Sequence, residues 1–148
     1  MNLLFQQCKL WVVGSSKSNQ DMKNIIILFF VLLFSGSVVA QEKQTLTVKE
    51  FRKASRKKDA VILDVRTPEE FAEGHIKNAV NIDWKNPEEF KNKATQLPKD
   101  SPIYVYCRSG VRSEQASNWL RTNGFTEVKD LKEGIQAWKS SGKKVSKE

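Results

Sequence analysis

An apolar run that leads directly into a cysteine-containing loop and then into a helix places the strongest constraint on the fold of this chain. The run Ile103–Tyr106 predicts a buried strand, and Cys107 follows it without a break. After a short loop, Ala116, Trp119 and Leu120 recur at the spacing that gives a helix one apolar face. The order strand, loop, helix places the Cys107 thiol near the positive end of a helix dipole.

The loop has the composition of an anion-binding nest. After Cys107 it holds two arginines, two serines, a glycine and a valine, namely Arg108, Ser109, Gly110, Val111, Arg112 and Ser113. Inward-facing loop amides and nearby guanidinium groups favour the thiolate, which is the nucleophilic form of cysteine. Gly110 permits a positive φ where the backbone curls round the sulfur. We therefore predict that Cys107 is a catalytic nucleophile and that the six residues after it bind an anionic substrate.

A second apolar run, Ala60–Val65, predicts another parallel strand that is covered on both faces. Its last part carries Asp64 and is followed by Arg66, at the strand end where ligands of open parallel sheets gather. Arg66 has two candidate roles: an internal ion pair with a carboxylate such as Glu70, or contact with an anionic substrate.

Strand and helix signals alternate along the rest of the chain. Capping signals start helices at Thr47 and Thr67, and a related one occurs at Asn86. Short strands are expected at 79–82 and 128–131, and a last helix is expected to end at Gly142, before a polar tail. Trp119 and the tryptophan of that last helix, Trp138, are expected in the core. The basic residues that end the first helix, Arg52, Lys53, Arg56, Lys57 and Lys58, have no interleaved aromatic residues, so a solvated helix face is favoured over nucleic-acid binding.

Residues 1–40 have the layout of a leader. Translation is expected to start at Met22, followed by a basic residue, the apolar run Ile25–Phe34 and small residues before a cut after Ala40. A retained membrane anchor is the alternative, although 16 residues are fewer than the ~20 that span a bilayer comfortably. Either way we expect residues 41–148 to be an exported domain, periplasmic or secreted, and membrane-bound only if the leader is kept.

Cleavage would remove Cys8 and leave Cys107 unpaired. A free thiol in an oxidising compartment is a liability unless it is used, which favours a reactive cysteine over a small core residue. The net charge of +8 suits anionic substrates and partners, but it says nothing about the fold.

Four segments in order resemble the signatures of the rhodanese family of sulfurtransferases. Along the chain they are Asp64-Val65-Arg66, the stretch from Gly74-His75-Ile76 to Ile82, the loop from Cys107 to Arg112, and Leu131 to Trp138. The resemblance covers about Leu46 to Gly142. It implies an α/β three-layer fold with a five-stranded, mostly parallel central sheet and helices on both faces. It also implies a supporting, structural role for Asp64 and Arg66 and a packing role for His75, the only histidine. No cofactor is expected, and no metal is expected because the sequence offers His75 no further ligands.

The resemblance implies that the Cys107 thiolate takes a sulfane sulfur from thiosulfate or a similar small anionic donor and forms a persulfide. A thiol, cyanide or a sulfur-relay protein would then accept the sulfur. The alternatives are a persulfide carrier or protein-binding module, and a cysteine phosphatase. Phosphatases place five residues between cysteine and arginine, whereas four separate Cys107 from Arg112, which favours sulfur over phosphate. Glu133 stands where relatives often have glycine, and it could weaken donor binding or pair with a loop arginine.

Overall fold

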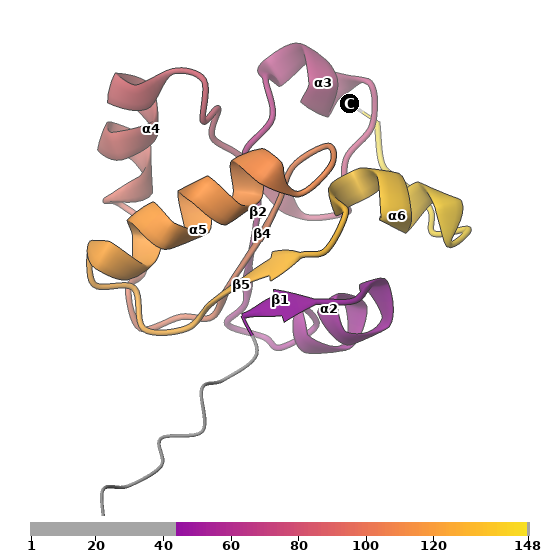
Figure 1. Ribbon diagram of the computed structural model, residues 1–148, viewed down its shortest axis with the longest axis horizontal. Helices are drawn as coiled ribbons and strands as arrows, with labels where there is room; N and C mark the ends of the chain where they lie inside the picture. Colours follow the sequence, from indigo (N-terminus) through magenta and orange to yellow (C-terminus); the bar gives the residue numbers. More distant parts are fainter. Residues whose placement is uncertain (1–43, 148) are drawn as a thin grey trace, which may run out of the picture. The chain divides into compact units, whose positions relative to one another are not determined.

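The computed structural model describes residues 44–147 and contains a five-stranded sheet in the order β1-β5-β4-β2-β3 (Figure 1). All four neighbouring pairs run parallel, which confirms the α/β prediction and makes the sheet parallel throughout. The strands are β1 (Thr45–Leu46), β2 (Val61–Asp64), β3 (Ala79–Asn81), β4 (Ile103–Tyr106) and β5 (Val128–Leu131).

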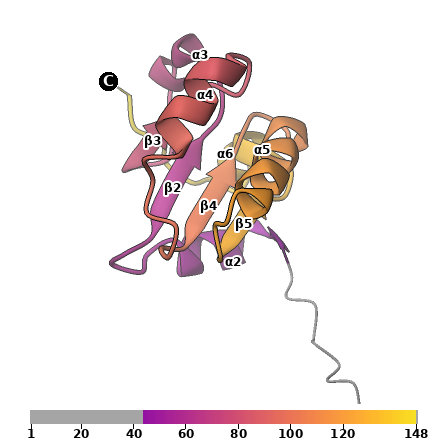
Figure 2. The same cartoon turned by 90° about the vertical axis from the view of Figure 1, so that its left-hand side faces the viewer.

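Helices cover both faces of this sheet (Figure 2). The helices are α2 (Val48–Ala54), α3 (Pro68–Ala72), α4 (Pro87–Ala94), α5 (Val111–Thr122) and α6 (Gly134–Ser140). Residues of α4 and α5 pack in one core cluster, and residues of α2 and α6 pack in the other. The molecule therefore has three layers, with the sheet in the middle.

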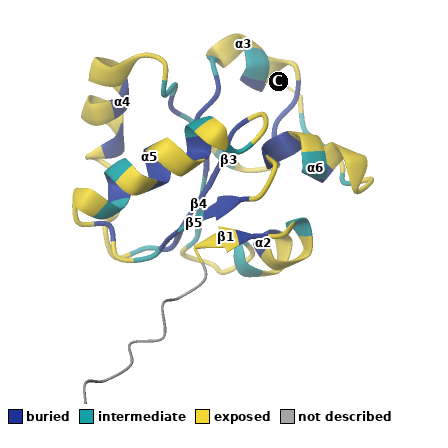
Figure 3. Ribbon diagram, in the orientation of Figure 1, coloured by how far each residue is buried: buried dark blue, intermediate teal, exposed yellow. Residues whose placement is uncertain are grey.

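The central strand β4 supplies both clusters because its side chains alternate between the two faces. Ile103 and Val105 belong to the α4 and α5 cluster, whereas Tyr104 and Tyr106 belong to the α2 and α6 cluster. All four are buried, as Figure 3 shows for the strand as a whole. This burial on both sides is why the run has no polar alternation and why it could be recognised as a parallel strand.

The predicted helix starts are present as hydrogen-bonded caps. The side chains of Thr47 and Thr67 accept hydrogen bonds from the amides of Glu50 and Glu70, and each glutamate carboxylate accepts one from the amide of the cap residue. Asn86 accepts from the Glu89 amide in the same way at the start of α4. These local contacts fix where the chain leaves each loop, so they also fix the loops at the carboxyl ends of the strands.

The C-terminal segment departs from the expected polar tail. Ser146 and His75 form an antiparallel bridge, with the Ser146 amide donating to the His75 carbonyl at 2.8 Å and the His75 amide donating back at 2.9 Å. The Trp138 indole N–H donates to the Lys144 carbonyl at 3.0 Å, and Val145 packs against the α2 and α6 cluster. The tail expectation was therefore wrong for residues 143–147.

Within residues 44–147 no helix combines the length and the apolar character needed to cross a membrane. The expected leader, its start at Met22 and its cleavage after Ala40 lie outside the described residues, as does Cys8.

Candidate active site

The Cys107 side chain lies at the carboxyl end of β4, in the loop that precedes α5. The residue is 1% exposed, and the Gly110 amide donates a hydrogen bond to its Sγ at 3.1 Å. Gly110 has a φ of 105°, a left-handed conformation that a side chain would strain. Gly110 therefore lets the loop double back so that a main-chain N–H faces the sulfur.

The start of α5 fixes the far side of the loop. The Gly110 carbonyl accepts bonds from the Glu114 amide at 3.0 Å and from the Ser113 hydroxyl at 2.9 Å. Ser113 is fully buried, so its hydroxyl holds the loop from inside. The sulfur lies three residues before Gly110, the N-cap of a twelve-residue helix, whose dipole favours negative charge there.

The first turn of α6 holds the near side of the loop. The amides of Ile135 and Gln136 donate to the carbonyls of Cys107 and Arg108, at 2.8 and 3.2 Å. A trans peptide carries its N–H opposite its carbonyl, so the amides of Arg108 and Ser109 point away from α6. The N-termini of α5 and α6 thus hold the cysteine loop from its two sides.

Arg112 and Glu70 form a bidentate ion pair beside the loop. The two terminal nitrogens of Arg112 donate to the two carboxylate oxygens of Glu70 at 2.7 and 2.8 Å. The hydrogen bonds from Arg112 lower the pKa of Glu70 to about 2. In turn Glu70, followed more weakly by Cys107, raises the pKa of Arg112. The arginine thus stays charged near the thiol, but its guanidinium is already bound to a carboxylate.

The remaining loop residues face solvent. Arg108 and Ser109 are exposed, and the Val111 side chain is unusually open for an apolar residue, at 62%. Glu133 is exposed beside the loop in a left-handed conformation, with a φ of 59°. Among the described residues, neither Glu133 nor Arg108 takes part in an ion pair. The rim of the site is therefore formed by side chains that can meet a substrate.

Asp64 and Arg66 form a buried ion pair that supports the site at the carboxyl end of β2. Arg66 donates to both carboxylate oxygens of Asp64, with a shortest distance of 2.6 Å, and to the Gly74 carbonyl at 3.0 Å. Burial alone would lower the pKa of Arg66, but the bonds and charge of Asp64 raise it above its ordinary value. The internal ion pair expected for Arg66 is present, but its partner is Asp64, and Glu70 pairs with Arg112 instead.

Tyr106 and His75 complete this supporting layer. The Tyr106 hydroxyl accepts a bond from the Ile76 amide at 3.0 Å, and burial together with the charge of Asp64 raises its pKa far above the usual range. His75 stacks on Phe71 with ring centroids 3.9 Å apart, and its Nδ1 lies 3.1 Å from the Phe71 carbonyl oxygen. His75 is buried in these packing contacts, and within the described chain it makes no hydrogen bond to Cys107.

The comparisons with known proteins agree with this arrangement. The family model of the rhodanese-like domain matches residues 47–141. The chain belongs to the rhodanese-like family. This confirms the resemblance found in the sequence, and most of the described residues lie within the matched range.

Individual relatives lie in the same family. An uncharacterised protein, YqhL of Bacillus subtilis, is 41% identical over 79% of this chain and 94% of its own length. A protein of Allochromatium vinosum named sulfurtransferase is 37% identical over 57% of this chain and 76% of its own. The crystal structure of a rhodanese-related protein from Thermoplasma volcanium has a TM-score of 0.63 and 30% identity, covering 71% of this chain and 99% of that one. The family and its sulfurtransferase member support a sulfurtransferase.

Proposed function

We propose that this protein moves a sulfane sulfur from thiosulfate, or a similar small anionic donor, to a thiophilic acceptor through a persulfide on Cys107. The observation that carries the proposal is the 3.1 Å hydrogen bond from the Gly110 amide to Cys107 Sγ, at the N-terminus of α5. A main-chain donor and a helix dipole both stabilise negative charge on sulfur. The same groups would stabilise the terminal sulfur of a persulfide.

The first step would displace sulfite. The Cys107 thiolate attacks the outer sulfur of thiosulfate, a new S–S bond forms, and the bond between the two donor sulfurs breaks with its electron pair leaving on sulfite. The products are a persulfide anion on Cys107 and sulfite, so the total charge of minus three is unchanged. In the second step, cyanide or a thiolate attacks the outer sulfur of the persulfide and restores the thiolate. Cyanide leaves as thiocyanate.

The residues of the site have two kinds of role: some stabilise the anion on sulfur, and others attract the anionic donor. Gly110 and the α5 terminus stabilise the sulfur anion, as an oxyanion hole stabilises an oxygen anion. Exposed Arg108 is the guanidinium that can bind the departing sulfite directly. Arg112, bound to Glu70, contributes positive field and loop rigidity. This division assigns donor recognition to Arg108 more than to Arg112.

The test is replacement of the nucleophile. After a pulse of thiosulfate, intact-mass spectrometry of the wild-type protein should show a gain of one sulfur atom, localised to Cys107, with one sulfite released per chain. Cys107→Ser should gain no sulfur and form no thiocyanate, while its circular dichroism stays that of the wild type. Thiocyanate formation by the serine variant would refute the covalent scheme.

A persulfide carrier is the second candidate, and the exposure of the loop rim favours it. Cys107 is buried whereas Val111 beside it is 62% exposed, so a partner protein could dock on the rim and present its own thiol. Rapid repeated turnover with cyanide would identify an enzyme. One sulfur loaded per chain, released to a protein thiol but only slowly to cyanide, would identify a carrier.

We also propose that the domain is exported. The apolar run and small residues before Gln41 support this location. Expression of the full chain followed by fractionation should place the protein outside the cytoplasm, and N-terminal sequencing of that fraction should begin at Gln41. A chain that keeps its leader and sediments with membranes would instead be anchored.

A further inference from the structure

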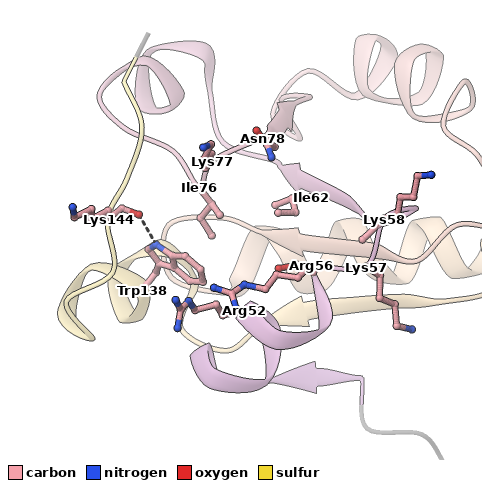
Figure 4. Close-up of a pocket in the computed structure, with 12 residues that line it drawn as sticks. Arg52, Arg56, Lys57, Lys58, Ile62, Ile76, Lys77, Asn78, Trp138 and Lys144 are labelled. Carbon is pink, nitrogen blue, oxygen red and sulfur yellow. Dashed lines mark hydrogen bonds between the residues drawn. The ribbon is translucent and has the colours of Figure 1, made fainter.

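A second, strongly basic pocket lies away from the cysteine loop. It has a volume of about 570 Å³, within the range of small-molecule sites, and lies on the side of the sheet that carries α2 and α6 (Figure 4). Six cationic residues line it: Arg52, Arg56, Lys57, Lys58, Lys77 and Lys144. Cys107 and the six residues that follow it do not line this pocket.

The cations that line the pocket come from separate parts of the chain. Arg52 lies on α2, whereas Lys77 precedes β3 and Lys144 belongs to the C-terminal segment. Basic residues near the end of α2 are explained by the helix dipole, but that explanation does not extend to the other two. Convergence of like charges is unfavourable unless an anion compensates it.

The pocket supplies almost no compensating charge of its own. None of its lining residues is acidic. Among residues 44–147, only Lys57 of the six cations forms an ion pair, at 3.4 Å from Glu127 and in an exposed position. The sequence predicted a solvated helix face for the basic residues from Arg52 to Lys58, and all five are exposed, but four of them also line a shared depression.

The base of the pocket is apolar. Ile62, Ile76 and Trp138 lie among the cationic side chains in Figure 4. The indole N–H of Trp138 is bound to the Lys144 carbonyl, which fixes the C-terminal segment and so places Lys144 at the rim. A purely inorganic anion would leave this base unused, whereas an organic body attached to the anion would cover it.

We propose that this pocket binds a compact organic polyphosphate, either a free phosphate ester or the phosphorylated headgroup of a lipid. Arginine guanidinium groups bind phosphate oxygens in pairs, and lysines add point charges. The pocket concentrates charge in a concave volume, which matches several phosphates on one small molecule. A nucleic-acid duplex would need a more extended and more open surface.

Isothermal titration calorimetry on the domain of residues 41–148 can test the site with defined probes. At about 0.15 M salt, where long-range attraction is screened, we expect ATP to bind one per chain and inorganic tripolyphosphate to bind more weakly, because only ATP covers the apolar base. Arg52→Gln with Arg56→Gln should weaken both at least tenfold. Binding of ATP no tighter than tripolyphosphate would refute the role of the base.

A matched control removes the same amount of charge from α2 without touching the pocket. Lys49 and Lys53 are exposed on α2 and do not line the pocket, and they are four residues apart like Arg52 and Arg56. The double variant Lys49→Gln with Lys53→Gln should bind ATP within about twofold of the wild type. Equal losses in the two double variants, or tighter binding of a glutamate oligomer than of tripolyphosphate, would overturn the proposal.

A vesicle experiment distinguishes the two sources of phosphate. Sedimentation with phosphatidylcholine vesicles that contain cardiolipin, whose headgroup carries two phosphates, would identify a lipid headgroup if it depends on Arg52 and Arg56 but not on Lys49 and Lys53. ATP binding without vesicle binding would identify a free ester, and absence of both would refute the site. Cys107→Ser should bind each probe like the wild type, so failure of the sulfur chemistry and failure of this site are separable.

Discussion

At the scale of single residues, the Arg112–Glu70 pair determines how charge is held beside the nucleophile. Glu70→Gln keeps an acceptor for the capping box of α3, because glutamine also serves at that position, but it removes the carboxylate charge. Both side chains are about one-fifth to one-quarter exposed, so we expect a modest loss of about 1–2 kcal/mol in the free energy of unfolding at pH 7. Urea denaturation measures it.

The pH dependence of that loss follows from the depressed pKa of Glu70. In the folded protein it is about 2, against an ordinary 4.5, so the pair stabilises fully above pH 4.5 and its contribution is lost as the pH falls toward 2. The difference between wild type and Glu70→Gln should therefore shrink across that window. A difference that stays constant down to pH 2 would show that the charge of Glu70 is not its source.

The Asp64–Arg66 pair should be more costly to break, because it is buried. Asp64 is 0% and Arg66 3% exposed, so Asp64→Asn would leave a buried guanidinium that keeps the Gly74 carbonyl but loses the carboxylate bound directly to it. We expect a loss of about 3–5 kcal/mol in unfolding free energy. The double variant Asp64→Asn with Arg66→Met should recover part of it, and a double variant as unstable as the single one would contradict this account.

At the scale of elements, α6 approaches the cysteine loop so closely that Gly134 leaves no room for a side chain. Gly134 has a φ of 58°, and a side chain there would stand 2.6 Å from the Arg108 carbonyl oxygen. Gly134→Ala should cost about 2–4 kcal/mol through strain and collision, and it should reduce sulfur transfer more than tenfold by displacing the loop. Thermal denaturation and thiocyanate formation report the two effects.

Gly142 provides the matched control for backbone strain. It also has a positive φ, 68°, but a side chain there would meet nothing within 4 Å. Gly142→Ala should therefore cost only about 1 kcal/mol and leave transfer within twofold of the wild type. Equal effects at the two glycines would mean that strain, and not the approach of α6 to the loop, limits the site.

Elements set by local contacts were predictable from the sequence. Thr47 and Thr67 cap helices through residues only three positions away in the sequence. The uninterrupted apolar run of β4 predicts a strand that is buried on both faces. Strand β1 was not located, because two residues show no period and their partners lie far along the chain, as the Thr45 hydrogen bond to Asp130 illustrates.

The site divides in the same way. The cysteine loop is contiguous, so strand, nest and helix could be inferred together. The partners of its charges could not, because Arg112 meets a glutamate 42 positions earlier and the nearer candidate, Arg66, turns back to Asp64. The contacts of α6 with the cysteine loop could not be predicted either, because they are hydrogen bonds between main-chain atoms, which every residue type can form.

At the scale of the whole molecule, the C-terminal segment closes the chain onto the loop between α3 and β3. Ser146 exchanges two main-chain hydrogen bonds with His75, which stacks on Phe71, and the neighbouring Gly74 accepts from Arg66. The segment thus links the α6 side of the fold to the layer that supports the site. Its contacts with Cys107 are indirect, so we expect it to govern stability more than catalysis.

Ser146→Pro tests this link, because proline removes the N–H that donates to the buried His75 carbonyl. An unsatisfied buried acceptor costs about 1–3 kcal/mol, which lowers Tm by roughly 4–8 °C per kcal/mol in a domain of this size. Ser146→Ala keeps both main-chain bonds and should melt within about 2 °C of the wild type. Sulfur transfer at 25 °C should be unchanged in both variants, because the contacts of the cysteine loop with α5 and α6 remain. Loss of transfer in Ser146→Pro without a fall in Tm would instead make the C-terminal segment part of the catalytic machinery.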